Sequence, residues 1–309
     1  MITEAQSRRT ERAAKKRQRE LEKLLKARTR LSEMEQARLV VEAFENKLAV
    51  LLSVHRETSP AVDWFAVYST LPPFQKSHTE GAPDETQTSE WAKKQALARR
   101  VLDGDSSGYI DALTNMSAFS ELAALGESIE FSVESRRVIA CELRLTGREA
   151  IPSEVPAVSP KGQLISKPMP KARFHEIYPD YVCSCVLRIG REVFALLPID
   201  TLIVSALIGS PQGAIGPKTE GCILSVAITR ETLAAMDFER LDPSDAIQTL
   251  IHRGDMTASK RRGEFTWVPP LQVEDVNGHP SASAGVDALW SRVRKMRSRI
   301  QRSLRRSKA

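Results

Sequence analysis

Residues 5–56 contain no Gly or Pro and are rich in Ala, Glu, Lys, Arg and Leu, the residue types with the highest helix propensity. Apolar side chains are sparse from Leu21 to Met34 and dense from Leu39 to Leu52. This pattern predicts one long helix whose second half docks on the rest of the chain while its first half projects into solvent. The heptad pattern is interrupted at Arg28, so the pattern does not decide whether the chain forms a homo-oligomer through this helix.

Further along the chain, strand and helix periods alternate. Residues 128–134 and 136–145 alternate apolar with polar positions, which predicts a hairpin with its turn near Ser135. Residues 200–208 and 222–229 predict two more strands, and residues 242–253 predict a capped helix. Residues 178–196 predict a buried helix that Pro179 begins or kinks, and the proline-bearing residues 151–170 predict a loop.

The predicted fold class is α+β: a long N-terminal helix, a body of mixed helices and antiparallel hairpins, and a basic amphipathic C-terminal helix. The predicted segments are a basic helical arm at 1–56, a globular body at 57–275, a linker at 276–287 and the basic helix at 288–309.

Charge divides the chain in the same way. The net charge is +6, but residues 8–30 hold eleven Lys/Arg against three Glu, about +8, and the last twenty residues add +9. The remainder therefore carries 6 − 8 − 9 = −11. Two basic ends on an acidic body indicate segments that bind polyanions or fold back on the body.

The C-terminal segment has a narrow apolar stripe, because Leu289, Val293, Met296, Ile300 and Leu304 recur at helical spacing. We expect its basic side chains to contact phosphates without reading bases. The predicted nucleic-acid-binding residues are Arg292, Arg294, Lys295, Arg297, Arg299, Arg302, Arg305 and Arg306 of this segment and Arg12, Lys15, Lys16 and Arg19 of the arm.

No catalytic set is evident. Cys141, Cys183, Cys185 and Cys222 are predicted to be reduced and buried, and we expect no cofactor and no metal ligand. The enzymatic alternative is a metal-dependent nuclease that uses Glu130, Glu134 and Glu142. Arg144 stands where such nucleases usually carry Lys, and Arg is a poor proton-transfer group because it stays charged.

The chain has no apolar run of about 18 residues and no apolar core in its basic N-terminal stretch, so we expect a cytoplasmic protein. The predicted function is that of a non-enzymatic accessory subunit of a larger assembly. Its expected partners are nucleic acid, bound with sequence tolerance, or an acidic protein, in preference to a membrane. The nuclease alternative would belong to a bacterial antiviral defence or DNA-maintenance system.

Several stretches together resemble a family of uncharacterised bacterial proteins with a charged helical N-terminus. They are SVHRETSPAVDW with LPPF, KPMPKARFHEIYPDYVCSCVLRIGREVFALLP, ILSVAITRETL and FERLDPSDAIQTLIHRGD. The resemblance covers most of residues 50–270, with Pro179 as a departure. It implies one body domain with a helical arm, and it carries over no activity or catalytic residue.

Overall fold

The computed structural model describes residues 4–72, 85–116, 119, 126–209, 220–255 and 265–276, with side chains at all of these except 4–16, 85 and 127. The chain divides into two compact units: Met1–Leu51 with Ile151–Phe174, and Leu52–Ala150 with His175–Ala309. The predicted α+β class is confirmed. The predicted C-terminal helix lies outside the described residues, and the four-segment division stays a prediction.

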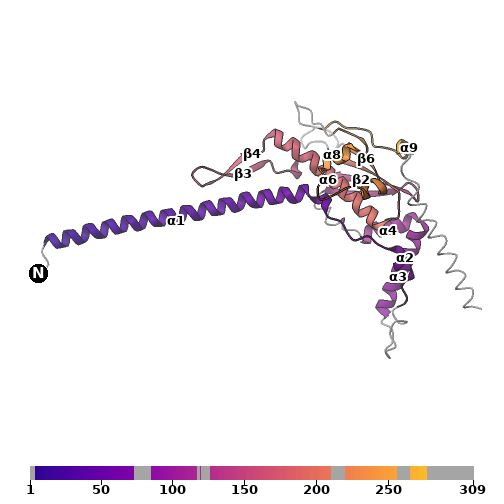
Figure 1. The fold of residues 1–309 in the computed structure, drawn as a ribbon, viewed down its shortest axis with the longest axis horizontal. Coiled ribbons are helices and arrows are strands. Elements are labelled where there is room, and N and C mark those ends of the chain that lie inside the picture. The colour runs from indigo at the N-terminus through magenta and orange to yellow at the C-terminus, as the bar shows by residue number, and fades with distance from the viewer. Residues whose placement is uncertain are drawn as a thin grey trace, which may run out of the picture. The chain divides into compact units, whose positions relative to one another are not determined.

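The first unit contains the long helix α1 (Glu4–Leu52), which the absence of Gly and Pro predicted. Its 49 residues correspond to about 74 Å at about 1.5 Å per residue. Beside it lies an antiparallel hairpin of β3 (Glu154–Val158) and β4 (Leu164–Pro168) (Figure 1). The loop predicted for this stretch is therefore wrong. Both strands of a two-stranded ribbon are edge strands, where the missing N–H of a proline is tolerated.

The second unit is built on a five-stranded sheet in the order β1-β2-β5-β6-β7 (Figure 1). The strands are β1 (Gly126–Val133), β2 (Val138–Leu145), β5 (Thr201–Gly209), β6 (Glu220–Thr229) and β7 (Ile251–Arg253). The predicted hairpin forms between β1 and β2, and β5 pairs with β6 in antiparallel fashion. The pairing of β2 with β5 is parallel, which joins the two hairpins into one sheet.

Helix α6 (Lys171–Leu196) begins in the first unit and continues into the second. It starts before the predicted position, so Pro179 lies inside the helix. All side chains from residue 181 to 190 are buried. Gly190 allows the helix to approach β6 closely, because an added Cβ would lie 3.1 Å from Cδ1 of Ile228. This contact identifies one face of the sheet as the face that α6 covers.

Residues 268–276 cover part of the opposite face. Ala227, which precedes Ile228 and therefore points to the other side of β6, packs in a cluster with Ile203 and Leu271. The Leu271 N–H donates to Oγ of Ser225 at 2.9 Å, which fixes this segment against the sheet. It ends in the short helix α9 (Val273–Val276).

The remaining described helices belong to the second unit and are short except for α3. They are η1 (Val54–Arg56), α2 (Trp64–Ser69), α3 (Glu85–Asp103), α4 (Ser106–Met116), η3 (Arg148–Ala150), α7 (Arg230–Ala234) and α8 (Pro243–Gln248). Thr229 caps α7, and Asp242 caps α8 at the predicted start of the helix at 242. The helix predicted over 242–253 is wrong at its end, because residues 251–253 pair with β6 as β7.

Within the described residues, no helix has both the length and the apolar character needed to cross a bilayer.

Candidate nucleic-acid interface

A line of basic residues follows one face of the first half of α1. Seven positions recur at intervals of four, three, four, four, three and four residues, and we call them the basic stripe: Arg8, Arg12, Lys15, Arg19, Lys23, Lys26 and Arg30. At about 100° of rotation and about 1.5 Å of rise per residue, they fall within about 80° of one another and extend over about 33 Å. The stripe is therefore a continuous row of positive charge.

The described part of the basic stripe is open to solvent. Every side chain from residue 17 to 33 is exposed, including the four stripe members in that range. The two acidic residues between 17 and 30 are Glu20 and Glu22, whose positions on the helix lie to either side of the stripe. No acidic residue interrupts the row, so its described part from Arg19 to Arg30 can meet a polyanion.

The hairpin of the first unit adds another cation at the end of the stripe. The guanidinium Nε of Arg30 donates to the backbone oxygen of Lys161 at 3.2 Å. The turn packs against α1 because Gly162 adopts φ +81° and has no side chain, and an added Cβ would lie 3.3 Å from Met34. Lys161 is exposed and lies next to Arg30, which extends the basic surface from the helix onto the turn.

One cation of this unit outside the basic stripe is committed to an internal contact. Arg173 donates from Nη2 to both carboxylate oxygens of Glu45, at 3.1 and 2.8 Å. This ion pair joins the start of α6 to the second half of α1 and neutralises both groups. Eleven of the seventeen Lys and Arg residues of the first unit lie within residues 8–30, so its basic charge is concentrated on the first half of α1.

The predicted site residues are placed only in part. Arg12, Lys15 and Lys16 lie in α1, and Arg19 is an exposed member of the basic stripe. The eight predicted residues of the C-terminal segment, Arg292 to Arg306, lie outside the described residues. Sequence reasoning missed Arg8, Lys23, Lys26 and Arg30, although their spacing belongs to the same series. It could not find Lys161, which the fold brings beside Arg30 from 131 residues away.

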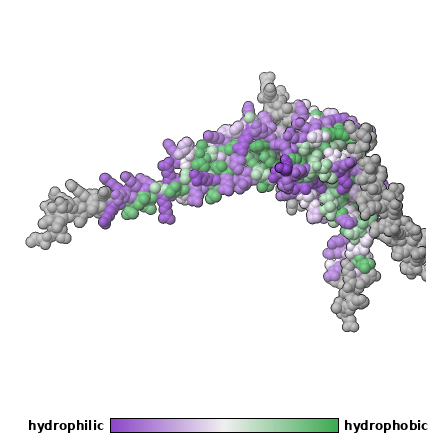
Figure 2. Space-filling view, viewed as in Figure 1, coloured by the Kyte–Doolittle hydropathy of each residue, from purple (hydrophilic) through white to green (hydrophobic). Residues whose placement is uncertain are grey.

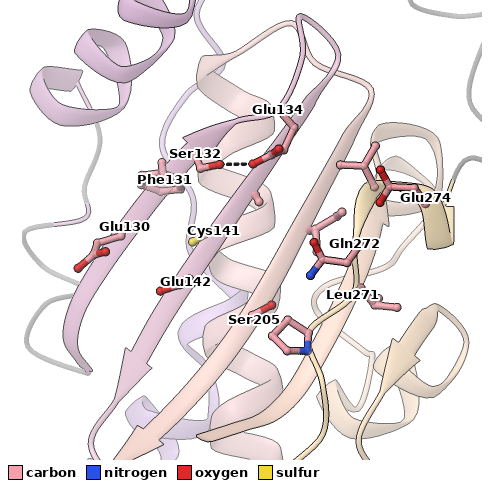
Figure 3. A pocket seen from close by; sticks show the side chains of 14 residues that line it. Glu130, Phe131, Ser132, Glu134, Cys141, Glu142, Ser205, Leu271, Gln272 and Glu274 are labelled. Atoms are coloured by element: carbon pink, nitrogen blue, oxygen red, sulfur yellow. Dashed lines mark hydrogen bonds between the residues drawn. The ribbon is translucent and has the colours of Figure 1, made fainter. Parts of the chain in front are cut away.

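The carboxylates considered for the nuclease alternative line a cavity of about 380 Å³ on the sheet face opposite α6. Glu130, Glu134 and Glu142 lie on one side of it, and Gln272 and Glu274 lie on the other (Figure 3). Across the part of the chain that the structure describes, no group of three or more His, Cys, Asp or Glu residues is arranged to hold a metal ion.

Arg144 occupies the centre of the carboxylates at this end of the sheet. Its guanidinium contacts Glu130 at 2.5 Å, Glu142 at 3.1 Å and Glu220 at 2.9 Å. The hydrogen bond to Glu220 raises the pKa of Arg144, and this effect outweighs burial, which lowers it. The guanidinium therefore stays charged and serves to neutralise these carboxylates, which is the role of a structural ion-pair cluster.

A buried Ser–His pair has no access to substrate. Nδ1 of His55 lies 2.7 Å from Oγ of Ser184, and both side chains are buried. Burial lowers the pKa of His55, so the ring is kept neutral. One helical turn further along α6, Arg188 pairs with Glu192 at 2.8 Å, also in the interior. These polar groups fix the segment after α1 on α6, and their burial indicates a structural role.

The four cysteines are free and buried, as predicted. Burial raises the pKa of every one of them, to about 11 for Cys222 and about 12 for Cys185. Thiols of this kind are protonated at neutral pH and are poor nucleophiles. No family model, curated protein or solved structure matches this chain significantly, so the geometry of its own residues is the basis for a functional proposal.

Proposed function

We propose that this chain is a non-enzymatic binding component that contacts the phosphate backbone of nucleic acid through the basic stripe of α1. The observation that carries this proposal is the spacing of seven cations on one face of a continuous helix, with the side chains of the described members exposed. A long, regular row of this kind has no evident use in stabilising the fold.

The dimensions of the stripe fit a polyphosphate. Its cations occur about every 5.5 Å along the axis, and duplex DNA carries one negative charge for about every 1.7 Å of its length. Extended Lys and Arg side chains can therefore each reach a phosphate without distorting the duplex. Since these side chains are exposed and not held in one direction, we expect them to act as charges and not to read base edges.

The experiment is the salt dependence of binding to a fluorescent duplex of about 25 base pairs, a length that covers the stripe at about 3.4 Å per base pair. Changing Arg19, Lys23 and Lys26 to Ala removes three cations. If each contacts a phosphate, the slope of log K against log salt should become less steep by about 2–3.

The matched control changes two exposed cations of α1 outside the basic stripe, Arg38 and Lys47, to Ala. This control should alter the slope by less than about 1, because both positions lie beyond Arg30, where the stripe ends, and outside its arc on the helix. An equal loss in both variants would mean that only net charge matters. Binding of both variants with the affinity and salt slope of the unchanged chain would overturn the proposal.

A further inference from the structure

Helix α1 carries a second, apolar stripe on the side opposite the basic stripe. Its members, which we call the leucine stripe, are Leu21, Leu24, Leu25, Leu31 and Leu39, and they are 59–67% exposed. At about 100° per residue their mean direction is about 180° from that of the basic stripe. The buried hydrophobic side chains of α1 are Ala37 and Leu48, which lie on the basic side. The leucine stripe is therefore uncovered within the described first unit.

A contiguous row of exposed leucines favours association with a partner more strongly than the same number of scattered apolar side chains does. Figure 2 shows hydrophobic side chains along α1 between its hydrophilic ones. Burial of each exposed leucine would be favourable, and a helix that projects without packing is only marginally stable by itself.

Two charged residues within the leucine stripe restrict what the partner can be. Arg28 and Glu35 lie among the leucines at positions that share their direction, and both side chains are exposed. A lipid surface would have to bury both charges without a counter-charge, which is costly. A partner helix with the opposite charges at the matching positions would satisfy both.

We propose that the leucine stripe is covered by helix α1 of a second copy of this chain, in antiparallel orientation, with the two-fold axis between Leu31 and Ser32. In this alignment Arg28 of each copy faces Glu35 of the other, which forms two symmetric ion pairs. Leu24 of each copy likewise faces Leu39 of the other. The single sequence thus supplies its own complementary partner.

The charge of the whole helix favours this orientation over the parallel one. Residues 8–30 carry about +8, whereas residues 31–52 hold four Glu against Arg38 and Lys47, which gives 2 − 4 = −2. A parallel pair without stagger would place the two +8 segments side by side and Arg28 opposite Arg28. The antiparallel pair places each basic half beside the acidic half of the other copy.

Charge reversal in the full-length chain tests the pairing. Sedimentation equilibrium should show a dimer whose dissociation constant rises about tenfold or more for Arg28→Glu and for Glu35→Arg, because each creates two like-charge contacts. The double change Arg28→Glu with Glu35→Arg should restore the dissociation constant to within about threefold of the original. The matched control is Arg19→Glu, which makes the same change of charge on the basic stripe and should leave association unchanged.

Disulfide trapping tests the orientation. A mixture of Leu24→Cys chains and Leu39→Cys chains should form mainly the mixed cross-link, with little background because the native cysteines are buried. A cross-link of Leu24→Cys chains to one another would show a parallel pair and overturn the proposal. A monomer at every concentration would also overturn it, as would binding to phosphatidylcholine vesicles that Leu24→Asp abolishes. The proposed nucleic-acid contact does not depend on these outcomes. Arg19→Glu changes only the basic stripe, and Arg28→Glu changes only the leucine stripe, so the two proposals can fail independently.

Discussion

Replacement of Ser184 by Ala tests whether the buried polar contacts of α6 hold the segment after α1 in place. Ser184 is fully buried, and its Oγ accepts from the backbone N–H of His55 at 3.1 Å. The same Oγ lies 2.7 Å from Nδ1 of His55 and donates to the backbone oxygen of Leu52 at 3.1 Å. One hydroxyl therefore serves three groups that have little access to water.

The expected loss of stability follows from which groups can find another partner. Without Oγ, the ring N–H of His55 can turn to the carbonyl oxygen of Leu52, which already interacts with it. The backbone N–H of His55 has no such alternative, and a buried donor left unpaired costs about 1–3 kcal/mol. With a net loss of about 1 kcal/mol for the remaining bonds, we expect Ser184→Ala to lower the free energy of unfolding by about 2–3 kcal/mol.

Urea unfolding followed by tryptophan fluorescence measures this effect. At an m-value of about 2–3 kcal/mol/M, the midpoint should fall by about 1 M. The control is Ser132→Ala, which removes an exposed hydroxyl that donates to Glu134 in the same unit and should change the free energy by less than about 0.5 kcal/mol. If Ser184→Ala also costs less than about 0.5 kcal/mol, water replaces the hydroxyl and the contacts do not hold this segment.

Three further outcomes are expected. Burial lowers the pKa of His55 below its ordinary value of 6.5, so the unfolded chain binds the proton more readily. Unfolding free energy should therefore fall as the pH drops below about 6.5, with a weaker dependence in His55→Gln, as urea titrations at several pH values would show. Deletion of residues 288–309 should weaken binding to a labelled duplex by several orders of magnitude at low salt, and unchanged binding would contradict the predicted role of that segment. Plasmid and RNA should stay intact with Mg²⁺ or Mn²⁺, whereas cleavage that Glu142→Ala abolishes would favour the nuclease alternative.

Local patterns predicted those elements whose residues all favour one conformation. Helix α1 was predictable because no helix breaker occurs in it, and β1 and β2 were predictable because their alternation is regular and their turn is short. The β3–β4 hairpin was missed because Pro156 and Pro168 suggest a loop, and the tolerance of prolines in it depends on each strand being an edge strand. Strand β7 was missed because three residues are too few for a period, and its pairing with β6 is set by tertiary structure.

The candidate site was predictable in one respect only. The spacing of the basic stripe is present in the sequence and needs only the assumption of a helix. The position of Lys161 beside Arg30 depends on the hairpin, and the exposure of Leu39 depends on which side of α1 the first unit buries. Amphipathic patterns indicate that a face must be covered, but they do not show whether the same chain or another molecule covers it.

Dimerisation through the leucine stripe and nucleic-acid binding through the basic stripe together determine how many duplexes one assembly can hold. In an antiparallel pair the leucine stripes face inward, so the two basic stripes lie on opposite outer sides, and helix axes in contact are about 8–10 Å apart. A single duplex cannot reach both sides, and one dimer would therefore bind two nucleic-acid segments. Arg28→Glu would then leave binding to one duplex in place while it reduces energy transfer between duplexes that carry donor and acceptor dyes, at concentrations where the unchanged chain is a dimer. Arg19→Glu would weaken binding and energy transfer together, because it affects the contact with each duplex and leaves the dimer in place.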